Sequence, residues 1–195
     1  EVFIPGLIHK HRDIQGSTTF ATVESIDEIN PDIIDSCKRL CKSFNYEGLF
    51  GIEMIKRGKD HFFIEMNLRN DATTYALSTA GINLPIAYYK YITNDNYIIE
   101  IQKKVNTINS IVEFNDCIHI LKGQLSPLQW VKDLKGSRCK YFYNKEDIKP
   151  FYKKLKEFLH TKNIHSVLDE YDFIYRYESI QENIESYNVD LKDAK

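Results

Sequence analysis

The chain has 195 residues, of which 43% are hydrophobic and 13% aromatic, so it can form one packed domain or one domain with a smaller appendage. Its 26 basic and 28 acidic residues give a formal net charge of −2, which offers no bulk electrostatic reason to expect nucleic acid or an anionic membrane as a partner. No apolar run approaches the roughly 18–20 residues that a membrane-spanning helix needs. We therefore expect neither nucleic acid nor a membrane as a partner.

The first 44 residues predict two strands and a helix. Side chains alternate between apolar and polar after Gly6, and a turn at Gln15-Gly16 separates this strand from the next. Asn30 and Pro31 then supply the N-cap and the first-turn proline of an amphipathic helix. The expected elements are strands at 1–12 and 18–24 and a helix at 31–44.

The next part predicts a hairpin followed by two short helices. The apolar segments "GLFGIEMI" and "HFFIEMNLR" flank "KRGKD", which is the pattern of a β-hairpin over 47–70. A short helix is expected at 71–80, closed by Gly81 as its C-terminal cap. Another is expected at 83–91, with Pro85 in its first turn.

The polar segment "TNDN" at 93–96 is the best candidate for a domain boundary, because it forms turns and carries no apolar residue. We expect a first domain at 1–95, an α/β extension at 96–185 and a frayed tail at 186–195. The predicted fold class is α+β, with a mainly antiparallel sheet flanked by helices. The elements expected beyond the boundary are strands at 97–105, 111–121 and 171–177 and helices at 126–135 and 148–161.

The four cysteines fit a protein with free thiols. Cys37 and Cys41 lie four residues apart on the apolar face of the expected helix, so we interpret them as small core residues before zinc ligands. No CxxC pair and no His-x-x-x-His partner completes a metal site around them or around Cys117 and Cys139. Free buried thiols suit a reducing compartment, and we expect the protein to be cytoplasmic.

The segment "HFFIEMNLRNDATTY" at 61–75 carries a polar side chain at every second position of an apolar strand. Because side chains alternate across a strand, Glu65, Asn67 and Arg69 are expected on one face. A polar face can simply be solvated, but an acid, an amide and a base in this order suit a metal ion and an anion. The opposite face is expected to point into a core with Ile64, Met66 and Leu68.

A second acidic residue, Glu53, lies in the preceding apolar strand, where a glutamate is costly to bury unless it is paired or bound to a cation. A three-residue connection, 58–60, would place Glu53 opposite Glu65, whereas a two-residue connection would send them to opposite faces. Two facing carboxylates repel unless a cation lies between them. Mg²⁺ or Mn²⁺ fits, with Asn67 adding a carbonyl oxygen and Arg69 within reach of the anion that the metal holds.

The segment "YEGLFGIEMIKRGKDHFFIEMNLRN" resembles the metal-binding core of the ATP-grasp superfamily, which includes biotin carboxylase, carbamoyl phosphate synthetase and the D-alanine–D-alanine ligases. The signature there is an acidic residue in one strand, a turn, and a strand ending in (I/V)E(I/V)NxR. Glu53 and the stretch 64–69 match it, although Leu68 stands where the family often has proline or threonine. "STAGINLP" at 78–85 is similar to the segment that follows in carboxylate–amine ligase-like and D-aspartate-ligase-like members. The resemblance covers about 1–92.

The resemblance implies an ATP-dependent ligase that activates a carboxylate as an acyl phosphate for attack by an amine or a thiol. Glu53, Glu65 and Asn67 would hold Mg²⁺ (or Mn²⁺) at the ATP phosphates, and Arg69 would be the catalytic residue that contacts the transferred phosphoryl group. The chain would be the C-terminal lobe of the ATP-grasp fold. Its partners would be the two substrates and an N-terminal lobe of the same protein, expected upstream of Glu1, without which it would bind ATP weakly and catalyse nothing. A homodimer is a further possibility.

Four more residues are candidates for binding phosphate or substrate. Lys10 and Arg12 end the first strand and share a face if alternation holds, although such a cluster can equally be a solvated strand end. Asn70 and Asp71 follow the arginine of the signature. They are expected either to cap the next helix or to line the acceptor pocket.

Two other functions stay open. The chain can be a non-catalytic ATP-grasp-like binding or scaffolding module, in which residues 96–195 provide an interaction or dimer surface. A metal-dependent hydrolase that uses the paired glutamates is disfavoured, because the sequence offers no plausible set of histidine ligands.

Overall fold

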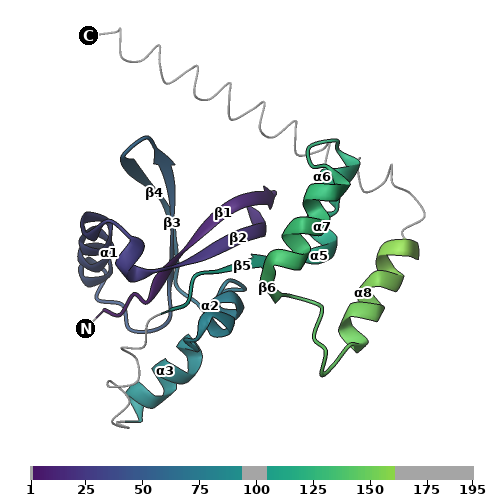
Figure 1. The fold of residues 1–195 in the computed structure, drawn as a ribbon. Coiled ribbons are helices and arrows are strands. Elements are labelled where there is room, and N and C mark those ends of the chain that lie inside the picture. Colours follow the sequence, from purple (N-terminus) through teal and green to yellow (C-terminus); the bar gives the residue numbers. More distant parts are fainter. Residues whose placement is uncertain (1, 94–104, 161–195) are drawn as a thin grey trace, which may run out of the picture. The chain divides into compact units, whose positions relative to one another are not determined.

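The computed structural model describes residues 2–93 and 105–160 (Figure 1). The chain forms two compact units, Glu1–Asn144 and Lys145–Lys195, a division that differs from the boundary expected near residue 95. In the second unit the described residues contain helix α8 (Lys149–His160), where the sequence predicts one. The predicted strands at 97–105 and 171–177 and the tail at 186–195 fall wholly or largely outside the described residues.

The first unit is built around a four-stranded sheet, mostly antiparallel, which confirms the predicted α+β class (Figure 1). The strands lie in the order β1 (Gly6–Ile14), β2 (Ser17–Ser25), β5 (Ile108–Ile111) and β6 (Ser137–Lys140). The first two pairs are antiparallel and the last is parallel. β1 and β2 join at Gln15-Gly16, where both residues have a positive φ (57° and 76°), as a tight hairpin turn requires.

The predicted second hairpin forms a two-stranded sheet of its own, β3 (Gly51–Arg57) with β4 (Asp60–Asn67). The prediction that its apolar side points into a core is wrong, because Ile64 and Leu68 are 50% and 51% exposed. Within the described residues the hairpin pairs with no third strand.

Three helices begin directly after a capping side chain and have a proline as their first or second residue, namely α1 (Pro31–Ser43), α3 (Leu84–Ile92) and α7 (Pro127–Gly136). These caps are Asn30, Asn83 and Ser126, which accept hydrogen bonds from the backbone N–H groups of Asp32, Ile86 and Gln129. The other helices that the structure describes in the first unit are η1 (Ile26–Glu28), α2 (Thr74–Ala80), α5 (Glu113–Asp116) and α6 (Ile118–Leu121).

The prediction of a strand at 111–121 is wrong, because β5 ends at Ile111 and two short helices follow it. Glu113 and Asp116 explain the difference, because both are buried, with 2% and 0% of their surface exposed. Residues three apart fall on opposite sides of a strand but on the same side of a helix. The helical turn therefore lets both carboxylates reach partners inside the unit.

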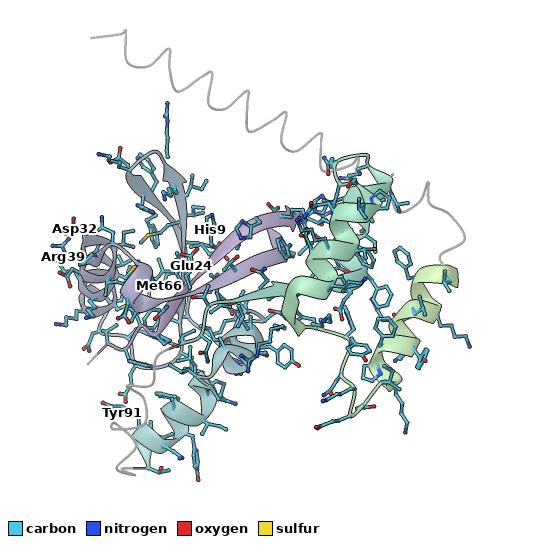
Figure 2. The ribbon with its side chains drawn as sticks, viewed as in Figure 1. His9, Glu24, Asp32, Arg39, Met66 and Tyr91 are labelled. Atoms are coloured by element: carbon cyan, nitrogen blue, oxygen red, sulfur yellow. The ribbon has the colours of Figure 1, made fainter. Side chains whose placement is uncertain are left out.

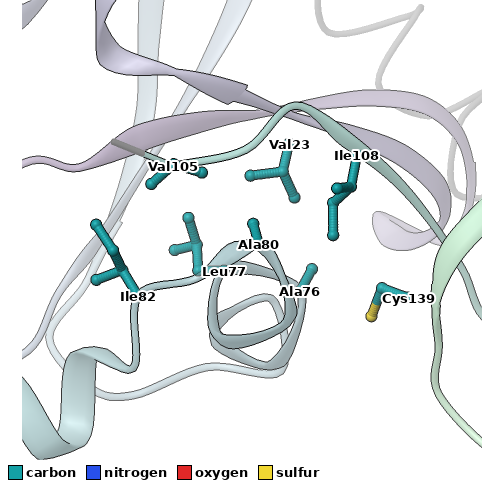
Figure 3. Close-up of a cluster of buried hydrophobic side chains, with 8 residues drawn as sticks. All are labelled: Val23, Ala76, Leu77, Ala80, Ile82, Val105, Ile108 and Cys139. Carbon is teal, nitrogen blue, oxygen red and sulfur yellow. The ribbon is translucent and has the colours of Figure 1, made fainter. Parts of the chain in front are cut away.

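The core of this unit lies between α2 and the four-stranded sheet (Figure 3). Ala76 and Ala80, one helical turn apart, are almost fully buried, and their small side chains let the helix approach the strands closely. A hydrogen bond also fastens the segment before α2 to the residue after β6. The Tyr141 hydroxyl donates it to the Ala72 carbonyl oxygen at 3.1 Å. The cluster comprises Val23, Ala76, Leu77, Ala80, Ile82, Val105, Ile108 and Cys139.

Candidate functional site

The hairpin β3–β4 places Glu53 directly opposite Glu65, as predicted. The route to this pairing differs from the predicted one. Arg57 pairs with Asp60, so the connection has two residues rather than three, and this register continues to Met54 opposite Phe63. A bulge at Ile64 then shifts the register by one residue and restores the Glu53–Glu65 pair.

Asn67 lies on the same face as Glu65, since its Nδ2 donates a hydrogen bond to Glu65 Oε1 at 2.8 Å. Glu65 is exposed and Asn67 is half-buried. With its nitrogen on the carboxylate, the amide directs its carbonyl oxygen elsewhere, and half a turn about χ2 would exchange the two atoms. The pair thus offers either a donor or a further oxygen ligand next to the Glu65 carboxylate.

Glu53 is paired with a lysine from the other sheet. Lys10 Nζ lies 2.7 Å from Glu53 Oε2 and 3.3 Å from the carbonyl oxygen of Gly16. Both side chains are about one-third exposed, 34% for Lys10 and 36% for Glu53. Strand β1, the β1–β2 turn and strand β3 therefore meet at this ammonium group, and a positive charge already lies against one of the two facing carboxylates.

The donor chemistry here fits a hard divalent cation. Glu53 and Glu65 are adjacent across the ladder, Asn67 can add a third oxygen, and the Lys10 ammonium is a cation in contact with Glu53. Magnesium sites of this kind use one or two carboxylates and complete their shell with water and substrate phosphates. Residues 2–93 and 105–160 contain no group of three or more His, Cys, Asp and Glu side chains placed to hold a metal ion. Any metal bound here would thus rely on the two glutamates, the amide and the substrate.

Arg12 is bound by two carboxylates and does not share the surroundings of Lys10. Its Nε and Nη2 donate to the two oxygens of the fully buried Asp116 at 2.9 and 2.7 Å, and its Nη1 lies 2.9 Å from Asp133 Oδ2. The guanidinium also lies 4.2 Å over the Phe20 ring. Burial opposes its charge, but the hydrogen bonds and the carboxylates raise the pKa of Arg12 above its ordinary value.

The predicted alternation of Lys10 and Arg12 fails because the β1–β2 register shifts between them. The shift is a bulge of the kind that re-aims side chains near a strand end. Arg12 is consequently directed toward α5 and α7. To contact a phosphate, its guanidinium would have to leave Asp116 or Asp133. Its predicted role in binding phosphate stays a prediction.

The histidines on either side of Lys10 contact side chains of β2. His9 lies beside Glu24 (Figure 2), with its Nδ1 3.3 Å from Glu24 Oε1. His11 Nε2 lies 2.7 Å from Thr22 Oγ1. Burial, with the neighbouring charges of His9 and Arg12, lowers the pKa of His11. Both imidazoles thus have partners on the neighbouring strand.

Arg69, at the end of the signature, is exposed. Within the described structure its guanidinium makes one long contact, from Nη1 to the Asn70 carbonyl oxygen at 3.5 Å. Asn70 is exposed as well. Of the predicted site residues, Arg69 is therefore the cation with the weakest ties to the rest of the chain, and its side chain can reorient toward a ligand.

Asp71 stabilises the turn before α2, whose N-cap residue is Thr73 and makes no side-chain capping hydrogen bond. Its two predicted roles, capping this helix or lining the acceptor pocket, stay predictions. Its Oδ1 accepts hydrogen bonds from the backbone N–H of Thr73, at 2.9 Å, and from the Thr73 hydroxyl. Its Oδ2 lies against Gly51 at the base of the hairpin, where an added Cβ would be 2.9 Å away. Gly51 pairs with Asn67 in the hairpin. Asp71 therefore places the start of α2 beside the end of the hairpin that carries Asn67.

Sequence reasoning missed the buried acids that organise the far end of the sheet. Glu113 accepts hydrogen bonds from three consecutive backbone N–H groups, at 141–143, and Asp116 accepts from Arg12 and Thr19. Both acids stand in an apolar segment, which is the signal that drew attention to Glu53. Nothing in the local spacing pairs Arg12 with a residue about one hundred positions further along the chain.

The chain matches none of the protein-family models, curated proteins or solved structures with which we compared it. None of the helices described is both long enough and apolar enough to cross a membrane. The four thiols are free and mostly buried, and burial raises the pKa values of Cys117 and Cys139 to about 11.

Proposed function

We propose that this chain is the C-terminal part of an ATP- and Mg²⁺-dependent ligase that joins a carboxylate to an amine. The observation that carries the proposal is the Glu53–Glu65 pair, with Asn67 beside Glu65 and Lys10 against Glu53. The resemblance of 46–70 to the ATP-grasp metal-binding core supports the same reading. The α+β class is compatible with the lobe that this family would require.

Each residue has a defined part in the proposal. Glu53, Glu65 and Asn67 would hold Mg²⁺ (or Mn²⁺), which supplies positive charge against the phosphates of ATP. Arg69 is exposed and loosely held, so its guanidinium can approach the γ-phosphoryl group as charge develops on it. Lys10 adds a second cation on the side of Glu53.

The proposed reaction has two steps, phosphorylation of the carboxylate and attack by the amine. A carboxylate oxygen of the substrate attacks the γ-phosphorus, the bond to the β–γ bridging oxygen breaks, and ADP leaves. The amine nitrogen then attacks the acyl carbon, the carbon–oxygen bond to phosphate breaks, and inorganic phosphate and one proton are released. One carboxylate oxygen of the substrate ends up in the phosphate.

A non-catalytic binding or scaffolding role is the second candidate, and it has its own support. Several large apolar side chains on or just after the hairpin are half-exposed, as on a surface that binds another protein. Glu53 is already paired with Lys10 and so does not depend on a metal for its partner. The exposed side chains are Ile55, Phe62, Phe63, Ile64 and Leu68, between 50% and 58% exposed.

Transfer of ¹⁸O to phosphate and trapping of the acyl phosphate distinguish the two candidates. The full-length protein is incubated with Mg·ATP and with panels of ¹⁸O-labelled carboxylates and amines. The measured products are ADP, ¹⁸O-labelled phosphate and, when hydroxylamine replaces the amine, the hydroxamate. A ligase releases ADP only with a cognate acid and transfers one ¹⁸O atom to phosphate. Glu65→Gln should lose at least about a hundredfold in ADP release, because it removes charge from the proposed ligand set. Glu47→Gln, at an exposed position before β3, is the matched control and should keep the wild-type rate.

Absence of ADP release with every substrate pair would favour the binding module. Wild-type activity in Glu65→Gln would contradict the proposed metal role even if a ligase reaction were found.

A further inference from the structure

Lys10 differs from the other cation of strand β1 in how firmly it is held. Arg12 is 18% exposed and bound to two carboxylates, whereas Lys10 is 34% exposed and shares its ammonium between one carboxylate and one backbone carbonyl oxygen. A lysine has a flexible four-carbon stem and a compact charge that can be re-solvated easily. Lys10 can therefore leave its position without exposing a buried charge, and Arg12 cannot.

The carboxylate that Lys10 contacts is one of the proposed metal ligands. Lys10 Nζ lies 2.7 Å from Glu53 Oε2, which is hydrogen-bonding distance. A divalent cation bound to the same carboxylate would lie within a few ångströms of this ammonium, and two like charges so close repel. Binding of a metal to Glu53 and the Lys10–Glu53 pair are thus competing states.

We propose that Lys10 is a placeholder for the divalent cation, an inference that rests on the proposed function. Without metal, its ammonium neutralises Glu53 and keeps β1 against β3. When the metal arrives with its anion, Lys10 leaves Glu53 and binds an oxygen of the same anion. The metal alone then binds weakly because it must displace Lys10, whereas the metal–anion complex binds well because the displaced lysine gains a new partner.

This exchange would make the site favour a metal that is already bound to phosphate over the free ion. The Gly16 carbonyl oxygen, 3.3 Å from Lys10 Nζ, supports the exchange, because it lies in the turn between β1 and β2 and can keep one hydrogen bond to the ammonium during the move.

The test measures Mn²⁺ binding to the full-length protein by electron paramagnetic resonance, first with Mn²⁺ alone and then with the Mn·ADP complex. In Lys10→Met, Mn²⁺ alone should bind about three- to tenfold more tightly, because a competing, partly exposed ion pair and one repelling charge are gone. The same variant should bind Mn·ADP about tenfold more weakly, since the freed ammonium is missing. Opposite signs for the two probes are the signature, because a lysine that merely supported the hairpin would weaken both.

Lys59→Met is the matched control. It removes one positive charge from the exposed tip of the same hairpin without touching Glu53, and it should change both affinities less than twofold. Thermal unfolding of each variant establishes that the fold is retained.

The outcomes separate the inference from the proposed function. Equal Mn²⁺ affinity in wild type and Lys10→Met, or a change of the same sign for Mn²⁺ and Mn·ADP, overturns the placeholder role and leaves the ligase proposal standing. Failure of wild type and every variant to bind either probe overturns both.

Discussion

Glu113 offers the sharpest test of how the sheet and the short helices are joined. Its carboxylate is 2% exposed and accepts from the backbone N–H groups of Tyr141, Phe142 and Tyr143, at distances from 2.8 to 3.3 Å. The substitution Glu113→Gln keeps the size and shape of the side chain. It replaces one of the two accepting oxygens with an NH₂ group, which can only donate.

The expected cost follows from that exchange. Whichever way the new amide turns, at least one backbone N–H loses its acceptor, and the new NH₂ group faces donors. A buried polar group left unsatisfied costs about 1–3 kcal/mol, so two such groups predict a loss of about 2–6 kcal/mol in the free energy of unfolding. For a protein of this length the midpoint of thermal unfolding should fall by at least about 5 °C.

Urea unfolding followed by circular dichroism measures this loss directly. Glu47→Gln makes the same chemical change at an exposed position and should stay within about 0.5 kcal/mol of wild type. A Glu113→Gln variant that also stays within this limit would refute the assigned hydrogen bonds, because no amide can satisfy three backbone donors as a carboxylate does.

Three further predictions follow from other contacts. Arg12→Met leaves the fully buried Asp116 carboxylate without its cation and should destabilise the protein by about 3–5 kcal/mol in urea unfolding, and a loss below about 1 kcal/mol would contradict the buried pair. Gly51→Ala places a methyl group 2.9 Å from Asp71 Oδ2 and should cost about 1–3 kcal/mol, of which Asp71→Ala in the same chain should recover part. Burial raises the pKa of Cys139 from 9.0 to about 11, so the native thiol should react with Ellman's reagent at pH 8 far more slowly than the unfolded one. Because the pKa of this thiol is higher in the folded state, its contribution to the free energy of unfolding is complete below pH 9 and is lost as the pH rises from 9 to 11. A midpoint of thermal unfolding that stays constant over this range would contradict the raised pKa of Cys139.

The sequence predicts elements well where their signals are local. Helix α1 has its cap at Asn30, proline at the next position and apolar residues at helical spacing, and the structure begins it at Pro31. The β3–β4 hairpin follows in the same way from two apolar strands around a turn. Local chemistry determines both, so no knowledge of distant partners is needed.

Elements that depend on distant partners are the ones that sequence reasoning missed. The stretch after Ile111 alternates enough to predict a strand, but Glu113 binds backbone groups at 141–143 and Asp116 binds Arg12, which favours a helical turn. β6 has four residues, too few to show a periodic pattern. The candidate site shows the same limit, because the Glu53–Glu65 pairing was predicted but Lys10 reaches Glu53 from a strand 43 positions earlier.

The bulge at Ile64 gives the hairpin an unequal tolerance to shortening. The residues on either side of it, Phe63 and Glu65, already face consecutive positions of β3, namely Met54 and Glu53. Excising Ile64 would therefore leave the acidic pair in register and simply straighten the strand. Excising one residue from the turn at Gly58-Lys59 would slide one strand past the other and part the two glutamates, so the chain can lose length at the kink but not at the tip.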